Sequence, residues 1–174
     1  MKLNQFIAEK GKHTSADAGE HLFRQGDLND KFYVLKSGLL KAYYLSADGK
    51  ESIKSFIFPG NSIGSLTALH SKAACSFSLI CLEPCELTVL PFQLLYDASQ
   101  TDPEISANLV DFLLRYGMKK EMREFELLCL TAEDRYRKLL ETMPEMFQSV
   151  TQNEIARYLG VTPVGLSRIK KRVG

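Results

Sequence analysis

Apolar residues recur at helical spacing near the end of the chain and predict two short helices joined by a tight turn over residues 151–174. Ile155 and Leu159 mark the inward face of the first helix, and Leu166 marks that of the second. Gly160 lies between them, where a turn requires a positive φ. This pattern is typical of a helix-turn-helix. The alternative is a purely structural hairpin, because any two packed helices need such a face.

Residues 103–129 also follow a helical period, but their apolar positions occupy two faces. Asp102 is suited to cap this helix and Pro103 to begin it. One face can pack on the rest of the chain, while the other needs a partner, most simply a second copy across a two-fold axis. A helix buried inside a single core is the alternative. The first face holds Ile105, Leu109, Phe112 and Tyr116, and the second holds Val110, Leu114, Met118, Met122 and Phe125.

Between residues 21 and 95 the pattern changes to short runs rich in β-branched and aromatic residues. Gly26, Gly38, Gly49 and Gly60 punctuate these runs at intervals of 12, 11 and 11 residues, which favours a small antiparallel barrel or jelly roll. Strands are expected at 31–36, 39–45, 52–58, 76–81 and 85–91. A short amphipathic helix over residues 2–9 and a polar break over 11–18 precede them, and a further helix is expected over 132–142.

The charge is distributed unevenly along the chain. The net formal charge is +1, yet residues 151–174 carry five basic side chains and one acidic one, so residues 1–150 carry −3. Positive charge gathered at one end is typical of a surface that contacts nucleic acid. No apolar run is long enough to cross a membrane or to form a signal peptide, which predicts a cytoplasmic protein without a membrane partner.

Catalytic and metal-binding patterns are not evident. The sequence contains no HExxH or CxxC motif, and its three histidines lie at no catalytic spacing. No catalytic residue and no metal site are therefore expected, and the chain is not expected to be an enzyme. The four cysteines are expected to be small buried apolar residues. A thiol or iron–sulfur sensor is the alternative, because Cys81 and Cys85 are close in sequence.

Several motifs occur together in a fixed order. They are FRQGD at 23–27, FYVLKSG at 32–38, DGKE at 48–51, FPGNSIG at 58–64, IARYLGVT at 155–162 and LSRI at 166–169. In this respect the chain resembles the Crp/Fnr superfamily of bacterial transcription regulators.

The resemblance implies an α+β fold with an N-terminal antiparallel double-stranded β-roll (jelly roll), a long dimerisation helix and a C-terminal helix-turn-helix. The last part is winged-helix-like with its wing truncated. The resemblance also implies three domains. Residues 1–101 form a cyclic-nucleotide-binding-like effector domain that includes the short N-terminal helix. Residues 102–130 form the dimerisation helix, and residues 131–174 form the DNA-binding domain.

The same resemblance implies a place for an effector. In relatives that bind a cyclic nucleotide, a glutamate accepts a hydrogen bond from the ribose and an arginine pairs with the phosphate. Ser65 and Cys75 stand at these positions here, so we expect no useful affinity for cAMP or cGMP and predict no cofactor. A less charged, unknown effector would lie among Ile63, Gly64, Ser65, Leu66, Cys75 and Ser76.

For DNA, the resemblance implies that Thr162 caps the second helix and that Arg168 contacts guanine. The expected partners are double-stranded DNA and a second copy of the chain. A small-molecule sensor with weak or no DNA binding remains the alternative. Pro163, Val164 and Ser167 are expected to face base edges, and Thr151, Gln152, Lys170 and Lys171 to contact phosphates.

Overall fold

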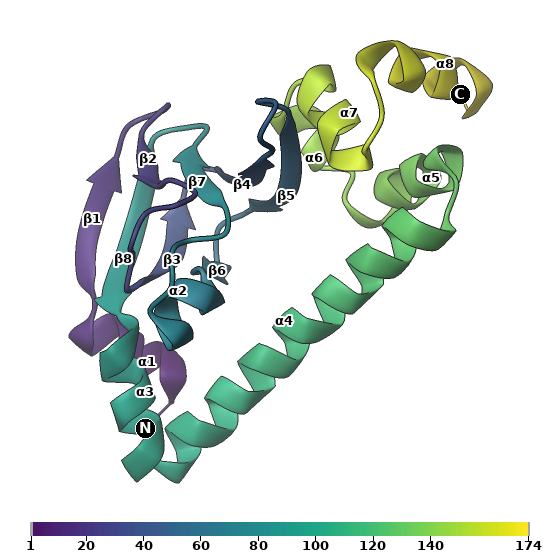
Figure 1. Cartoon of the computed structure of the whole chain (residues 1–174). Coiled ribbons are helices and arrows are strands. Elements are labelled where there is room, and N and C mark those ends of the chain that lie inside the picture. Colours follow the sequence, from purple (N-terminus) through teal and green to yellow (C-terminus); the bar gives the residue numbers. More distant parts are fainter. Residues whose placement is uncertain (1, 174) are drawn as a thin grey trace.

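Two four-stranded antiparallel sheets face each other in the computed structural model, which describes residues 2–173 (Figure 1). The first sheet has the order β1-β8-β3-β6 and the second β2-β7-β4-β5. The strands are β1 (Lys12–Ala16), β2 (His21–Phe23), β3 (Lys31–Ser37), β4 (Leu40–Leu45), β5 (Glu51–Ile57), β6 (Ser62–Ile63), β7 (Ser78–Cys81) and β8 (Cys85–Pro91).

The space between the sheets is filled by apolar side chains from both of them. Leu35, Leu40, Leu79 and Leu87 are completely buried there, and Phe77 is nearly so. Burial of this kind is the main driving force for closing the two sheets on each other. The expected jelly-roll fold is confirmed.

The expected glycine corners are confirmed. Gly26, Gly38, Gly49 and Gly60 all have φ between +82° and +95°. Gly38 is the most constrained of them, because an added Cβ would lie 2.4 Å from the Pro84 carbonyl oxygen. No other residue type fits this position without movement of the β8 end.

The expected polar break at residues 11–18 is wrong, because residues Lys12–Ala16 form β1 along the edge of the first sheet. Only Ala16 of this strand is buried, and main-chain pairing with β8 holds the rest. An edge strand of this kind leaves little apolar pattern in the sequence. The short strands β2 and β6, and the helices α2 (Leu66–Ser71), α3 (Phe92–Thr101) and α6 (Met146–Ser149), also fall outside the expected elements.

The long helix begins and ends as expected. α4 covers Pro103–Cys129, and the Asp102 side chain accepts hydrogen bonds from the Glu104 and Ile105 backbone N–H groups at 2.9 and 3.2 Å. In Figure 1, α4 runs from beside α1 (Leu3–Lys10) and α3 to α5 (Ala132–Thr142). No helix within residues 2–173 has both the length and the apolar character needed to cross a bilayer.

The buried apolar residues of α4 lie at its beginning. Ile105 and Leu109 are buried with residues of α1, α3 and the first sheet, and the Phe112 ring meets the Phe32 ring edge-on at 5.5 Å between centroids. Tyr116 continues this face toward β5, where its hydroxyl accepts a hydrogen bond from Lys54. Of the two apolar faces predicted for this helix, the first is therefore the one that packs against the chain.

The remaining helices pack on the outer side of the second sheet. α7 (Gln152–Leu159) and α8 (Pro163–Val173) share one apolar core with α5 and with Leu39, Ile53 and Phe56 of the roll. Figure 1 shows α7 beside β5. The C-terminal helices are thus joined to the roll by buried side chains as well as by the chain itself.

Candidate nucleic-acid interface

Helix α7 is defined at its start by a reciprocal cap. The Glu154 carboxylate accepts from the Thr151 backbone N–H at 3.1 Å, and the Thr151 hydroxyl accepts from the Glu154 backbone N–H at 3.3 Å. This arrangement satisfies backbone donors that a helix start otherwise leaves unpaired. Ile155, Ala156 and Leu159 form the buried face of the helix.

A tight turn separates α7 from α8. Gly160 has φ +70° and ends α7, and the Val161 backbone N–H bonds back to the Ala156 carbonyl at 2.9 Å. The Thr162 hydroxyl then accepts from the Gly165 backbone N–H at 3.0 Å, as expected for a residue that caps α8. Leu166 holds α8 against the shared core.

The opposite face of α8 is open to solvent. Val164 is 63% exposed, and no carboxylate of residues 2–173 lies within 4.0 Å of the Arg168 guanidinium. Lys170 donates to the Gln152 side chain at 3.0 Å, so the basic end of α8 is linked to the start of α7. The nine residues expected to contact DNA are all exposed, and five of them, Gln152, Pro163, Ser167, Lys170 and Lys171, line one shallow groove. The other four are Thr151, Thr162, Val164 and Arg168.

One arginine joins the ends of three helices. Arg135, in α5, donates to the Leu130 carbonyl at 2.7 Å and to the Leu159 carbonyl at 3.0 and 3.2 Å. These carbonyls lie at the C-terminal ends of α4 and α7, which have free acceptors and partial negative charge. Arg135 therefore fixes the helix-turn-helix to the end of the long helix.

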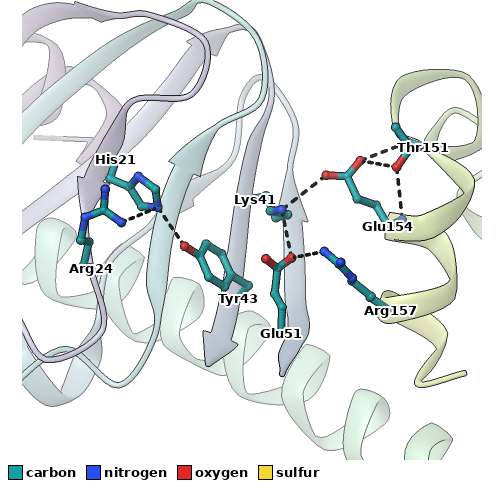
Figure 2. Close-up of polar contacts among 8 residues, drawn as sticks. All are labelled: His21, Arg24, Lys41, Tyr43, Glu51, Thr151, Glu154 and Arg157. Atoms are coloured by element: carbon teal, nitrogen blue, oxygen red, sulfur yellow. Dashed lines mark hydrogen bonds and ion pairs between the residues drawn. The ribbon is translucent and has the colours of Figure 1, made fainter. Parts of the chain in front are cut away.

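An ionic network joins α7 to the roll, as Figure 2 shows. The Lys41 ammonium, on β4, donates to Glu51 at 3.0 Å and to Glu154 at 3.4 Å, and Arg157 donates to the same Glu51 oxygen at 3.3 Å. Lys41 is only 8% exposed. We refer to Lys41, Glu51, Glu154 and Arg157 as the ionic network.

Sequence reasoning missed this network, and only the structure shows that Lys41 is covered. Leu40, Lys41 and Ala42 are three consecutive buried residues, and successive side chains of a strand point to opposite faces. Leu40 and Ala42 face the roll core, so Lys41 requires cover on the other side, which α7 provides.

A neighbouring polar group lies on the same outer face of the roll. His21 is within 2.8 Å of the Tyr43 hydroxyl and 3.3 Å of the Arg24 guanidinium (Figure 2). Burial, and then the positive charges of Arg24 and Lys41, lower the pKa of His21. A neutral imidazole suits this position.

The second apolar face predicted for α4, which we call the outer stripe, is exposed within residues 2–173. Val110 is 51% exposed, and Met118, at 65%, is the most exposed member of the stripe. Leu114, Met122 and Phe125 are also exposed. Met118 and Met122 also line a cleft that includes Phe56 and Tyr158.

The residues expected around an effector are closed on one another. Ser65 and Cys75 are each 2% exposed, and the Ser65 hydroxyl is 3.0 Å from that of Thr67. Ile63 and Gly64 are buried, Leu66 is partly buried and Ser76 is exposed. These residues surround the start of α2 on the side of the first sheet.

The cysteines differ in exposure. Cys75, Cys81 and Cys85 are buried in the roll core as expected, and burial with the nearby Cys85 raises the pKa of Cys81 to about 12. Cys129 is exposed at the end of α4, so the expectation of burial is wrong there. No element among the described residues covers that position.

Comparison with known families and proteins agrees with this architecture. Residues 13–102 match a family model described as "Cyclic nucleotide-binding domain". The relatives include "Transcriptional activator protein Anr" of Pseudomonas protegens, 29% identical over 88% of this chain and 67% of its own length. "Electron transport regulator A" of Shewanella oneidensis is 26% identical over 88% and 65%, and the "Anaerobic regulatory protein" of Haemophilus influenzae is 27% identical over 87% and 62%. The chain thus spans about two thirds of the length of these relatives, or somewhat less.

Solved structures show the same fold. FixK2 from Bradyrhizobium japonicum superposes with a TM-score of 0.81 at 19% identity, over 94% of this chain and 84% of FixK2. The CLP regulator of Xanthomonas campestris, described as c-di-GMP responsive, gives 0.77 at 20% identity, over 98% of this chain and 89% of its own. At this level of identity, the likeness establishes the arrangement of helices and strands.

Proposed function

Because the chain belongs to the Crp/Fnr family of transcription regulators, we propose that it binds double-stranded DNA as a homodimer through α8. The relatives are named as a transcriptional activator and as a regulatory protein, and neither is named as an enzyme. Residues on the exposed face of α8 read the major groove, and the basic residues at its edge hold the phosphates.

The exposed face of α8 is the observation that carries this proposal. Leu166 and Ile169 are buried below the helix, while Arg168 points away from the core without a carboxylate partner within residues 2–173. A buried or neutralised arginine would have to be freed before it could contact a guanine, and Arg168 needs no such step. Lys170 and Lys171 add positive charge beside it.

The outer stripe of α4 supports the proposed homodimer. A two-fold axis along α4 would bury Val110, Leu114, Met118, Met122 and Phe125 against the same residues of another copy. Pairing of this kind removes apolar surface from water and presents two α8 helices. The operator would then be palindromic, with half-sites about 34 Å apart.

Selection of duplexes from a random-sequence library with the full chain tests this function. The enriched site is then titrated by fluorescence anisotropy beside a scrambled duplex, at several stated salt concentrations. We expect Arg168→Ala to weaken binding to the enriched site by about 1–3 kcal/mol and to affect the scrambled duplex less. Lys171→Ala should weaken both equally and lower the salt slope by about 1.

Lys50→Ala is the matched control, because Lys50 is an exposed lysine in the turn between β4 and β5 and lies outside the proposed interface. Failure to enrich any sequence would contradict the proposal. Equal losses on both duplexes for Arg168→Ala would contradict the base-reading role of that residue.

We also infer that the roll does not bind cAMP or cGMP. Ser65 and Cys75, at the positions that would hold ribose and phosphate, carry no charge and are buried against their neighbours. A phosphate placed there would lose its hydration without a cation in exchange. Isothermal titration of the full chain with each nucleotide tests this, and micromolar binding of either one would refute it.

A further inference from the structure

The side chain of Tyr158 lies where three parts of the molecule meet. Tyr158 belongs to the last turn of α7, and its ring packs against that of Phe56, on β5 of the roll, at 5.8 Å between centroids. The guanidinium of Arg123, on α4, lies over the same ring at 3.9 Å from its centroid. One aromatic side chain of the helix-turn-helix therefore contacts both the roll and the long helix.

Arg123 also binds the main chain at the end of α7. Its guanidinium donates a hydrogen bond to the Tyr158 carbonyl, while Glu126, three residues later in α4, lies 3.9 Å from it. The Arg123 side chain is only 15% exposed, so solvent weakens these contacts little. A planar guanidinium can stack on a ring and donate from its edge at the same time, which an ammonium group cannot do.

The two arginines thus hold neighbouring carbonyls. Arg123, from α4, binds that of Tyr158, and Arg135, from α5, binds that of Leu159. Only three residues separate Leu159 from the start of α8 at Pro163. The long helix also reaches this turn, since a Cβ added at Gly160 would lie 3.8 Å from the Leu127 Cδ2 atom. The direction of α8 relative to α4 is therefore set at the end of α7.

This direction matters if α4 pairs with a second copy of itself. In such a dimer, the orientation of α8 relative to α4 fixes both the distance and the rotation between the two α8 helices. One additional base pair between two half-sites moves one of them by about 3.4 Å and turns it by roughly 35° around the duplex. A firmly held α8 pair therefore fits one spacing of half-sites much better than its neighbours.

We propose that Arg123 is a positioning residue that makes the dimer selective for the spacing between half-sites, and that it acts through Tyr158. The inference rests on the proposed function and assigns Arg123 no contact with DNA. Without the stack and the hydrogen bond, α7 is still held by Arg135, by the ionic network and by the shared apolar core. The helix-turn-helix then stays folded but varies more in its orientation relative to α4.

Binding of the full chain to duplexes of different spacing tests this role. The half-site obtained by selection is placed in a single-half-site duplex and in palindromes whose spacers differ by one or two base pairs. We expect the unaltered chain to prefer one spacing. Arg123→Met should weaken binding to the preferred palindrome by about 10-fold and to the single half-site by less than about 2-fold, because it lowers the effective concentration of the second α8 at its half-site. The preference among spacings should become correspondingly flatter.

Variants of Tyr158 and a second arginine provide matched comparisons. Tyr158→Leu removes the ring on which Arg123 stacks and should flatten the preference in the same way. Tyr158→Phe keeps the ring and the backbone carbonyl and should retain the preference. Arg115→Met changes an exposed arginine of the same helix and should leave both affinities unchanged.

An Arg123→Met protein that keeps the spacing preference of the unaltered chain would overturn the proposal. So would equal losses on the single half-site and the preferred palindrome, because they would indicate general damage to the DNA-binding helices. Sedimentation velocity and thermal melts verify that each variant is a folded dimer, and Tyr158→Leu replaces Arg123→Met if the latter does not fold. Absence of DNA binding by the unaltered chain is a different result, which would refute the proposed function and this inference with it.

Discussion

Replacement of Lys41 by methionine tests how strongly the ionic network holds α7 to the roll. Methionine keeps most of the length and packing of the lysine side chain and removes its charge. Glu154 then loses its ion-pair partner, and Glu51 keeps only Arg157 at 3.3 Å. The side chains of Glu51 and Glu154 are only 20% and 14% exposed, so water compensates for little of this loss.

The size of the effect follows from two opposing contributions. At an effective dielectric constant of about 20, opposite charges about 3 Å apart attract each other by about 5 kcal/mol. Most of this attraction is offset in the native state by the desolvation of the groups, but removal of one partner leaves the other desolvated and unpaired. Because Arg157 still serves Glu51, we expect a loss of about 2–4 kcal/mol in the free energy of unfolding, near the lower end for a broken buried pair.

Urea denaturation of the full chain at neutral pH, followed by circular dichroism, measures this loss. Lys50→Met, at an exposed position on the neighbouring turn, is the control and should change the free energy of unfolding by less than about 0.5 kcal/mol. The double variant Lys41→Met/Glu154→Gln should lose less than the sum of its two single variants, because the unpaired carboxylate is gone. A Lys41→Met protein as stable as the unaltered chain would refute the reasoning.

Three further predictions concern other parts of the molecule. Met118→Glu places a charge in the outer stripe of α4 and should shift the chain from dimer to monomer in sedimentation velocity; an unchanged dimer would show that α4 is not the interface. The pKa of Lys54 is about 7 in the folded chain, below its ordinary value of 10.5. Between pH 7 and pH 10.5 the unfolded chain therefore binds more protons at this residue, so Lys54 makes the free energy of unfolding rise with pH over that interval. Lys54→Met should therefore raise the melting temperature at pH 7, with the gain fading toward pH 10.5; a gain independent of pH would contradict the assignment. Iodoacetamide should alkylate the native chain at Cys129 and spare Cys81, whose buried thiol has its pKa raised to about 12; equal labelling in peptide mass spectra would contradict this burial.

The sequence is most informative where structure is determined by neighbours along the chain. The capping box at Thr151, the turn at Gly160 and the start of α4 at Pro103 all agree with the structure. Each depends on contacts within a few residues, so a local pattern is sufficient to predict it. The main strands of the roll were predicted for the same reason, since their hydrophobic runs are bounded by glycine turns.

Contacts between distant residues could not be predicted in this way. Lys41 meets Glu154, 113 positions later, and Lys54 meets Tyr116, 62 positions later. In the sequence each lysine resembles an ordinary solvent-facing residue of a strand, because nothing nearby shows that a helix will cover it. The edge strand β1 was missed for a related reason, since its pairing involves backbone atoms, which carry no side-chain signature.

The core shared by α5, α7, α8 and the second sheet also has a consequence for dissecting this protein. Leu39, Ile53 and Phe56 belong to the roll by sequence, yet the helices beyond residue 130 shield them from water. A fragment cut after α4 would leave these side chains uncovered and would be prone to self-association. Recombinant work on the roll and α4 alone would therefore need surface-modified versions, whereas the intact chain should melt as a single cooperative unit.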